Sequence, residues 1–246
     1  MKEFDAAEFS LDENSRLVIL SGAGVSADSG LKTFRGQGGL WEGHRVEEVA
    51  TPEAFDDHPE LVIRFYNERR RQLAEVEAND AHRAIAKLQK EMKERCFLVT
   101  QNVDDLHERG GAEKVCHMHG ELLQLKCMAG HKTRISGEQN MDMRCEECGG
   151  YLRPDIVWFG EVPYFIDNIQ RKVAECTHFI FTGTSSQVYP AAGLKGLAKQ
   201  AGAKVLNINL EIDEADWMTD YYIQGKASEV WPKCVEEILS LEYSKA

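Results

Sequence analysis

An apolar run that leads directly into a glycine-rich turn constrains the fold of this chain more than any other feature. Residues 17–20 read Leu-Val-Ile-Leu, which is typical of a strand buried in a parallel sheet. Just after them, Gly22, Gly24 and Ala27 match the spacing G-x-G-x-x-G/A. Such a turn lets backbone N–H groups approach a pyrophosphate, although the same spacing also occurs in plain tight turns. By itself the turn leaves both interpretations open.

Apolar runs and helical segments alternate along the chain. The predicted strands are Leu17–Leu20, Cys96–Thr100, Ile156–Phe159, Phe179–Thr182 and Val205–Leu210. Segments with helical periodicity lie between them, for example residues 81–92 and 191–201. This alternation predicts an α/β fold with a doubly wound, Rossmann-like parallel sheet.

Two segments interrupt the alternation and indicate a second, smaller unit. The first has no clear strand, and the second contains closely spaced cysteines. We therefore expect a Rossmann-like, dinucleotide-binding domain made of residues 1–35, 77–119 and 154–246. We expect a smaller helical and zinc-binding module made of residues 36–76 and 120–153.

Polar or glycine residues follow four of the predicted strands. They are Ser21-Gly22, Gln101-Asn102, Gly183-Thr184-Ser185 and Asn209. Open parallel sheets bind their ligands beyond the carboxyl ends of the strands. These loops are therefore predicted to meet at one crevice.

Composition and charge narrow the class of protein. The chain has 246 residues and a formal net charge of −12, which argues against nonspecific binding of nucleic acid. No stretch approaches the roughly 18 apolar residues of a membrane-spanning helix, and the N-terminus, M-K-E-F-D-A-A-E-F-S, has no apolar signal core. Seven cysteines, an odd number, fit reduced and partly metal-bound thiols. We expect a cytoplasmic protein that does not bind membranes.

A cysteine knuckle predicts one structural zinc ion. Cys145-Glu-Glu-Cys148 is a C-x-x-C pair, and Cys127 supplies a third thiolate. Gly130 stands where a second pair would have its other cysteine, and His131 follows it. The fourth ligand is therefore either His131 or absent.

Two further stretches contain side chains that can bind a ligand or transfer a proton. Thr100–Asp105 reads T-Q-N-V-D-D, which can hydrogen-bond a carboxamide and ribose hydroxyls or cap a helix that starts near residue 105. Val115–Gly120 reads V-C-H-M-H-G. Of its two histidines, one could face the crevice as a base while the other faces away.

Several motifs, taken together and in order, resemble the sirtuin family of NAD-dependent protein lysine deacylases. They are G-A-G-V-S-A-D-S-G-L-K-T-F-R, T-Q-N-V-D-D-L-H, H-G-E, C-E-E-C-G-G-Y-L-R-P-D-I-V-W-F-G-E and F-T-G-T-S-S-Q-V-Y-P-A-A. The resemblance runs from about Leu17 to Pro232. It is strongest to the bacterial type that has a Tyr-x-x-Arg pair.

The resemblance implies that NAD is a co-substrate and assigns its contacts. On the nicotinamide, phosphate and nearer ribose side, it implies Gly22, Ala23, Gly24, Phe34, Arg35, Gln101, Asn102, Val103 and Asp104. On the second phosphate and adenosine side, it implies Gly183, Thr184, Ser185, Asn209, Leu210, Glu211 and Ala227. His119 matches the general base, which would take a proton from a ribose hydroxyl after nicotinamide has left. The implied products are nicotinamide, free lysine and O-acyl-ADP-ribose.

The helical segment at residues 60–73 bears on the acyl group. Val62, Tyr66, Arg69 and Leu73 share one stripe, so a guanidinium interrupts a mostly apolar face. This arginine could extend to solvent or pair with a nearby acid. The resemblance instead implies that Tyr66 and Arg69 clasp the carboxylate of a succinyl or malonyl group, as guanidinium geometry allows. We expect acetyl and succinyl groups, and also malonyl groups, to be removed from protein lysines.

Three other functions are compatible with parts of the sequence. The same NAD site could transfer ADP-ribose to a protein, and mass spectrometry of the products would distinguish this alternative. A non-catalytic NAD-binding regulator would not need a base at His119. A hydride-transferring dehydrogenase would be expected to have an acidic residue at the end of a second strand, about 20 positions after the glycine turn, and residues 36–60 contain no such strand.

Overall fold

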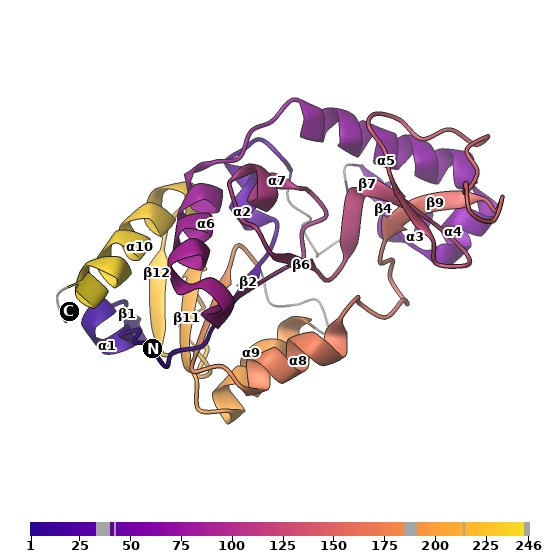
Figure 1. The fold of residues 1–246 in the computed structure, drawn as a ribbon. Coiled ribbons are helices and arrows are strands. Elements are labelled where there is room, and N and C mark those ends of the chain that lie inside the picture. The colour runs from indigo at the N-terminus through magenta and orange to yellow at the C-terminus, as the bar shows by residue number, and fades with distance from the viewer. Residues whose placement is uncertain (33–39, 42, 185–190, 214, 244–246) are drawn as a thin grey trace.

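A parallel sheet forms the centre of the larger part of the molecule (Figure 1). The computed structural model describes residues 1–32, 40–41, 43–184, 191–213 and 215–243. Within them the sheet has seven strands in the order β1-β12-β11-β10-β2-β5-β6, and every pairing is parallel. The strands are β1 (Lys2–Glu3), β2 (Leu17–Ser21), β5 (Cys96–Thr100), β6 (Val115–His117), β10 (His178–Thr182), β11 (Lys204–Asn209) and β12 (Tyr221–Gln224).

Helices cover both faces of this sheet, so the predicted doubly wound fold is confirmed. One face carries α1 (Ala6–Phe9), α6 (Asp80–Met92) and α10 (Ala227–Tyr243), and the other carries α8 (Ile166–Ala174) and α9 (Ala191–Gln200) (Figure 1). Strand β2 shows why its sequence is apolar throughout. Leu17 and Ile19 pack in the core on the α6 and α10 side, whereas Val18 and Leu20 pack on the α8 and α9 side. Among the described residues, no helix has the length and apolar character needed to cross a bilayer.

The smaller part combines helices with an antiparallel sheet. Its elements are β3 (Leu40–Trp41), β4 (His44–Arg45), α3 (Val46–Val49), α4 (Pro52–Asp57), α5 (Pro59–Ala74), β7 (Gly120–Cys127), β8 (Lys132–Arg134) and β9 (Leu152–Ile156). Helix α5 is joined to the second segment by Asn67, whose Nδ2 donates to the Gln139 carbonyl at 2.8 Å, and by Arg70, whose Nε donates to the Leu122 carbonyl at 2.9 Å. The two interrupting segments thus pack on one another.

The prediction that Ile156–Phe159 forms a strand of the parallel sheet is wrong. Strand β9 ends at Ile156 and pairs with β7 in an antiparallel sheet of three strands, and residues 157–159 continue as a loop. Ile156 and Trp158 are nonetheless buried, because they pack against the helices of the smaller part. An apolar run predicts that a segment is buried, but it does not predict which sheet the segment joins.

The direction of winding reverses between β2 and β10. From β2 the sheet continues through β5 to β6, and from β10 it continues through β11 to β12. The N–H of Gly22 donates to the Thr182 carbonyl at 2.9 Å, which joins the two loops at this point. Ligands of doubly wound sheets bind at such a reversal. The short helices α2 (Gly24–Ala27) and α7 (Leu106–Arg109) begin beside it.

Candidate functional site

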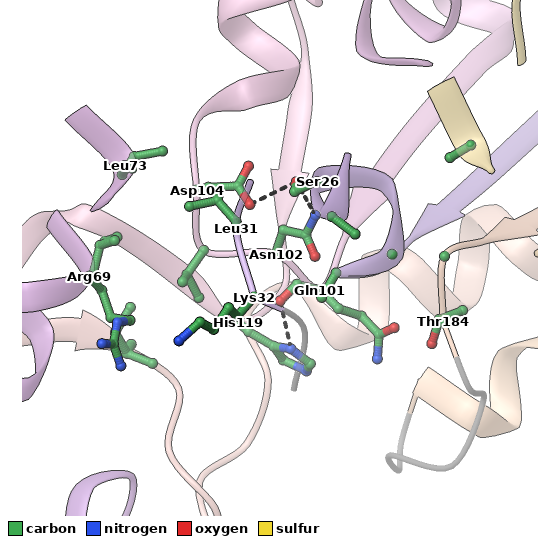
Figure 2. Close-up of a pocket in the computed structure, with 18 of the residues that line it drawn as sticks. Ser26, Leu31, Lys32, Arg69, Leu73, Gln101, Asn102, Asp104, His119 and Thr184 are labelled. Atoms are coloured by element: carbon green, nitrogen blue, oxygen red, sulfur yellow. Dashed lines mark hydrogen bonds between the residues drawn. The ribbon is translucent and has the colours of Figure 1, made fainter. Parts of the chain in front are cut away.

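One cavity of about 610 Å³ lies between the carboxyl ends of the strands and the smaller part (Figure 2). It brings together residues that are far apart in the sequence. Of the predicted site residues, those that line it are Ala23, Gly24, Tyr66, Arg69, Gln101, Asn102, Val103, Asp104, His119, Gly183, Thr184, Asn209, Leu210, Glu211 and Ala227. Gly22 packs against Gly183 and Thr184, two residues of the cavity lining. Phe34, Arg35 and Ser185 lie outside the described residues.

The glycine loops form a floor with no room for side chains. A Cβ atom on Gly22 would lie 2.7 Å from the Gly183 carbonyl oxygen, and one on Gly24 would lie 2.7 Å from the Gly183 Cα. Gly183 itself has a φ of 61°, in the left-handed region that favours glycine. Two backbone segments therefore approach closely at the switch point. The glycines are therefore required by the packing of these two segments, at the edge of the sheet where doubly wound folds bind their ligands.

A buried network of polar side chains forms one wall of the cavity. Ser26 Oγ donates to Asp104 Oδ2 at 3.0 Å and accepts from Asn102 Nδ2 at 3.1 Å. The other oxygen of Asp104 accepts the Leu106 N–H at 3.1 Å, so Asp104 both lines the cavity and holds the start of α7. Burial raises the pKa of Asp104. Of the two alternatives for this stretch, the contact between Asp104 and the Leu106 N–H supports the start of the helix, and the contact with a carboxamide and ribose hydroxyls stays a prediction.

His119 has a lowered pKa and one ring nitrogen bonded to the backbone. Its Nδ1 lies 3.1 Å from the Gln101 carbonyl, which can only accept, so Nδ1 carries the hydrogen. Burial lowers the pKa of His119, and this hydrogen bond only partly offsets the effect. The imidazole is therefore neutral near pH 7, with an Nε2 lone pair that can take a proton. Figure 2 shows the ring at the cavity, between Lys32 and Gln101.

The pKa of His117, two residues earlier, is shifted in the opposite direction. Its Nδ1 faces the Asn102 carbonyl at 3.2 Å, and its Nε2 faces the Glu108 carboxylate at 2.7 Å. Burial alone would lower the pKa of His117, but the bond to Glu108 and its charge raise it. Both ring nitrogens face oxygen acceptors, and the raised pKa favours the imidazolium form of His117. Only His119 of this pair lines the cavity.

The far end of the cavity is mostly apolar, and Tyr66 and Arg69 of α5 are two of its polar side chains. Tyr66 is fully buried, and its hydroxyl accepts from the Trp158 indole Nε1 at 2.8 Å. Arg69 is only 9% exposed, and its guanidinium carbon lies 4.6 Å from the centre of the Phe65 ring. The Arg69 Nη2 atom lies 3.6 Å from Glu68 Oε2. The apolar lining at this end includes Leu31, Leu73, Leu122, Ile156 and Trp158.

Sequence reasoning assigned no role to two residues that shape this site. Ser26 lies inside the glycine-rich stretch, and its position between Gly24 and Ala27 was a signal that it would face the loop. Trp158 lies in the W-F-G-E run, but the prediction of a strand there hid its place in the cavity wall.

The cysteine cluster lies in the smaller part. Cys127, His131, Cys145 and Cys148 place one donor atom each within 4.8 Å of one another. The Cys127 and Cys148 sulfurs are 3.6 Å apart, and His131 Nδ1 lies 3.5 Å from the Cys145 sulfur. His131 Nε2 lies 3.7 Å from a Glu147 carboxylate oxygen. This set of donors fits tetrahedral zinc.

Comparison with protein families and curated proteins agrees with this geometry. A family model described as "Sir2 family" matches residues 22–190. The NAD-dependent protein deacylase SIR2rp3 of Trypanosoma brucei brucei (strain 927/4 GUTat10.1) is 48% identical over 233 residues, which cover 92% of this chain and 96% of that protein. The NAD-dependent protein deacylase of Escherichia coli (strain K12) is 48% identical over 234 residues, which cover 92% of this chain and 83% of that protein.

Solved structures show the same fold. A structure described as a Sir2 homolog–NAD complex has a TM-score of 0.87 and 36% identity, and the match covers 98% of this chain and 96% of that one. Sir2Af2 bound to a myristoylated histone peptide has a TM-score of 0.72 and 31% identity, with 98% and 97% covered.

Proposed function

The chain belongs to the Sir2 family, and on that premise we propose that it is an NAD-dependent deacylase that removes succinyl, malonyl and acetyl groups from protein lysines. The observation that carries the acyl assignment is the presence of Tyr66 and Arg69 in the same cavity as His119. One end of the cavity then holds the acyl group and the other holds the nucleotide.

NAD is proposed to lie over the glycine floor. When bound, it supplies the ribose carbon that receives the acyl oxygen as nicotinamide leaves. The glycine turn gives the pyrophosphate close access to the backbone there, while the N–H groups of Gly22 and Gly24 are themselves bonded to the Thr182 and Gly183 carbonyls. The amides of Gln101 and Asn102 are proposed to lie on the nicotinamide side with Asp104. Asn209, Leu210, Glu211 and Ala227 line the cavity on the adenosine side.

His119 is proposed as the general base. Because its Nδ1 is committed to the Gln101 carbonyl, the lone pair on Nε2 is the one that can accept a proton from a ribose hydroxyl. The lowered pKa keeps that lone pair available at neutral pH. A proton accepted there gives an imidazolium that can return it during hydrolysis to free lysine and O-acyl-ADP-ribose.

Arg69 and Tyr66 are proposed to select the acyl group. A guanidinium in a largely apolar pocket favours an anionic partner, because a carboxylate can form two charge-assisted hydrogen bonds with it. Burial raises the pKa of Tyr66, so its phenol remains a hydrogen-bond donor at every physiological pH. A succinyl or malonyl carboxylate can use both groups, whereas an acetyl group can use neither.

Cys127, His131, Cys145 and Cys148 are proposed to hold one structural zinc ion. They lie outside the cavity-lining residues, so the ion would stabilise the smaller part rather than join the reaction.

The test is a steady-state comparison of acetyl-, malonyl- and succinyl-lysine forms of one peptide with NAD. Mass spectrometry should detect nicotinamide and O-acyl-ADP-ribose in equal amounts. ADP-ribose attached to the protein or peptide, without loss of the acyl group, would instead indicate transferase activity. A chain that cleaves acetyl-lysine but not succinyl-lysine would overturn the acyl assignment and leave the deacylase assignment standing.

A further inference from the structure

A partly buried ion pair between Arg153 and Glu161 closes the turn at residues 157–161, which lines the cavity. Arg153 Nη1 donates to Glu161 Oε1 at 2.9 Å, and Arg153 Nη2 donates to Glu161 Oε2 at 2.7 Å. Glu161 Oε2 also accepts a hydrogen bond from the backbone N–H of Trp158 at 2.8 Å, and Arg153 Nη2 donates to the Ile156 carbonyl at 2.8 Å. These bonds thus hold Ile156, at the end of β9, close to Glu161, at the other end of the turn. A forked guanidinium–carboxylate pair fixes orientation as well as distance.

The same ion pair orients the Trp158 ring. The Arg153 guanidinium carbon lies 3.6 Å from the centre of that ring, and Trp158 is almost completely buried. At its other end the indole donates from Nε1 to the Tyr66 hydroxyl at 2.8 Å. A continuous chain of contacts therefore runs from Arg153 through Trp158 to Tyr66.

We propose that Arg153 is a positioning residue for acyl selection, acting through Trp158 on the hydroxyl of Tyr66; this inference rests on the proposed function. A hydroxyl that accepts from the indole must direct its own hydrogen away from Trp158. The indole therefore sets the direction of the O–H bond that a succinyl or malonyl carboxylate receives. Without the indole N–H, the O–H bond can rotate, and the carboxylate loses a prearranged donor.

The expected signature is selective for acyl groups that carry a carboxylate. An acetyl group has no carboxylate, so rotation of the Tyr66 O–H bond leaves its binding unchanged. Removal of the Trp158 N–H should raise KM for the succinyl substrate and change kcat little, because the contact holds the acyl tail rather than the reacting atoms. A merely structural role would lower the rates for both substrates together.

The experiment compares acetyl- and succinyl-lysine forms of one peptide in the full-length protein. Trp158→Phe keeps an aromatic ring and removes the indole N–H. Arg153→Gln removes the two-pronged ion pair with Glu161, and Tyr66→Phe removes the hydroxyl. For Trp158→Phe we expect KM for the succinyl peptide to rise about five- to tenfold, the effect of one hydrogen bond, and to rise by clearly more than KM for the acetyl peptide. Arg153→Gln should change the succinyl-to-acetyl ratio in the same direction.

A matched control comes from another arginine of the smaller part. Arg144 lies 3.9 Å from the centre of the Tyr151 ring, in an exposed stack outside the cavity lining. Arg144→Gln removes an arginine–aromatic contact of the same kind, and it should leave both KM values unchanged.

The double variant Trp158→Phe/Tyr66→Phe tests whether Trp158 acts through the Tyr66 hydroxyl. If Trp158 acts through the Tyr66 hydroxyl, the double variant has the same succinyl-to-acetyl ratio as Tyr66→Phe alone. Additive effects, or equal losses for both peptides, overturn this inference and leave the proposed function intact. If Arg153→Gln fails to fold, the Trp158 and Tyr66 cycle still decides between these results. A wild type inactive on succinyl-lysine overturns the acyl assignment and this inference together.

Discussion

The Nδ1 hydrogen of His119 is donated to the backbone carbonyl of Gln101 at 3.1 Å, across 18 positions of sequence. Gln101 follows β5, and His119 lies two positions past the end of β6, the neighbouring strand. Strand pairing therefore decides which imidazole nitrogen faces the cavity. It also places the base beside the amide that we assign to the nicotinamide side.

His119→Asn should abolish removal of every acyl group. Loss of a general base typically costs about 10²- to 10⁴-fold in rate, and the effect should appear in kcat for acetyl- and succinyl-lysine alike. Thermal unfolding should change little, because His119 is only partly buried. His58→Asn, at an exposed position before α5, is the control. Full activity of the His119 variant would remove the assignment of the base.

The pH dependence should follow the neutral form of His119. Its pKa lies below the ordinary value of 6.5, because burial disfavours the charged ring. Activity is therefore fully present above that lowered pKa and is lost as the pH falls through it. The acid limb of kcat/KM should accordingly have its midpoint below 6.5. A midpoint clearly above 6.5 would contradict the lowered pKa of this partly buried ring.

Arg69→Met should change acyl preference. The variant keeps the apolar stem and removes the charge, so kcat/KM for succinyl-lysine should fall about 10²-fold, as expected when a charge-assisted bidentate contact is lost. Acetyl-lysine should be affected by less than about threefold, because it makes no such contact. Arg71→Met, on the same helix but paired at the surface with Glu138, is the matched control. Equal losses for both acyl groups would show that Arg69 only supports the fold.

Gly24→Ala should impair NAD binding. Its Cβ would lie 2.7 Å from the Gly183 backbone, so the two loops must separate. We expect a loss of about 1–3 kcal/mol in stability and a marked rise in KM for NAD. In Gly196→Ala, the new Cβ would make an ordinary 3.7 Å contact with the Met218 sulfur, and helix propensity should stabilise α9. Unchanged NAD affinity in Gly24→Ala would argue against the glycine floor as the pyrophosphate cradle.

Metal analysis tests the cysteine cluster and its fourth ligand. Cys127→Ala should purify with little zinc and unfold at a lower temperature, since structural zinc contributes directly to folding. His131→Ala should retain less zinc than wild type, whereas Cys116→Ala, outside the cluster, should retain one equivalent. Full zinc content in His131→Ala would show that three thiolates suffice.

Much of the candidate site follows from local sequence. The turn at Gly22 and Gly24 could be predicted because glycine spacing after a buried run restricts the backbone at short range. The loops at the ends of β2, β5, β10 and β11 could be assigned to one crevice, because parallel strands carry their carboxyl ends to one edge. Ser21 is an exception, since it is buried and does not line the cavity. The roles of individual residues within that crevice stay predictions.

Other features depend on contacts between distant residues. The segment at Ile156–Phe159 is apolar enough for a strand of either sheet, and its pairing with β7 decided that it lines the cavity instead. The fourth donor of the cysteine cluster was equally open, because nothing local places His131 beside Cys145.

The sequence by itself determined the alternation of strands and helices, the glycine turns and the supply of polar groups, since these depend on backbone preferences and on patterns of burial within short segments. Only the tertiary structure decided the state of the two histidines in one hexapeptide. Glu108 raises the pKa of His117, whereas burial lowers the pKa of His119 and the Gln101 carbonyl fixes which of its ring nitrogens carries the hydrogen. The physical reason is that a pKa depends on desolvation and on neighbouring charges, which the fold brings together from separate parts of the chain.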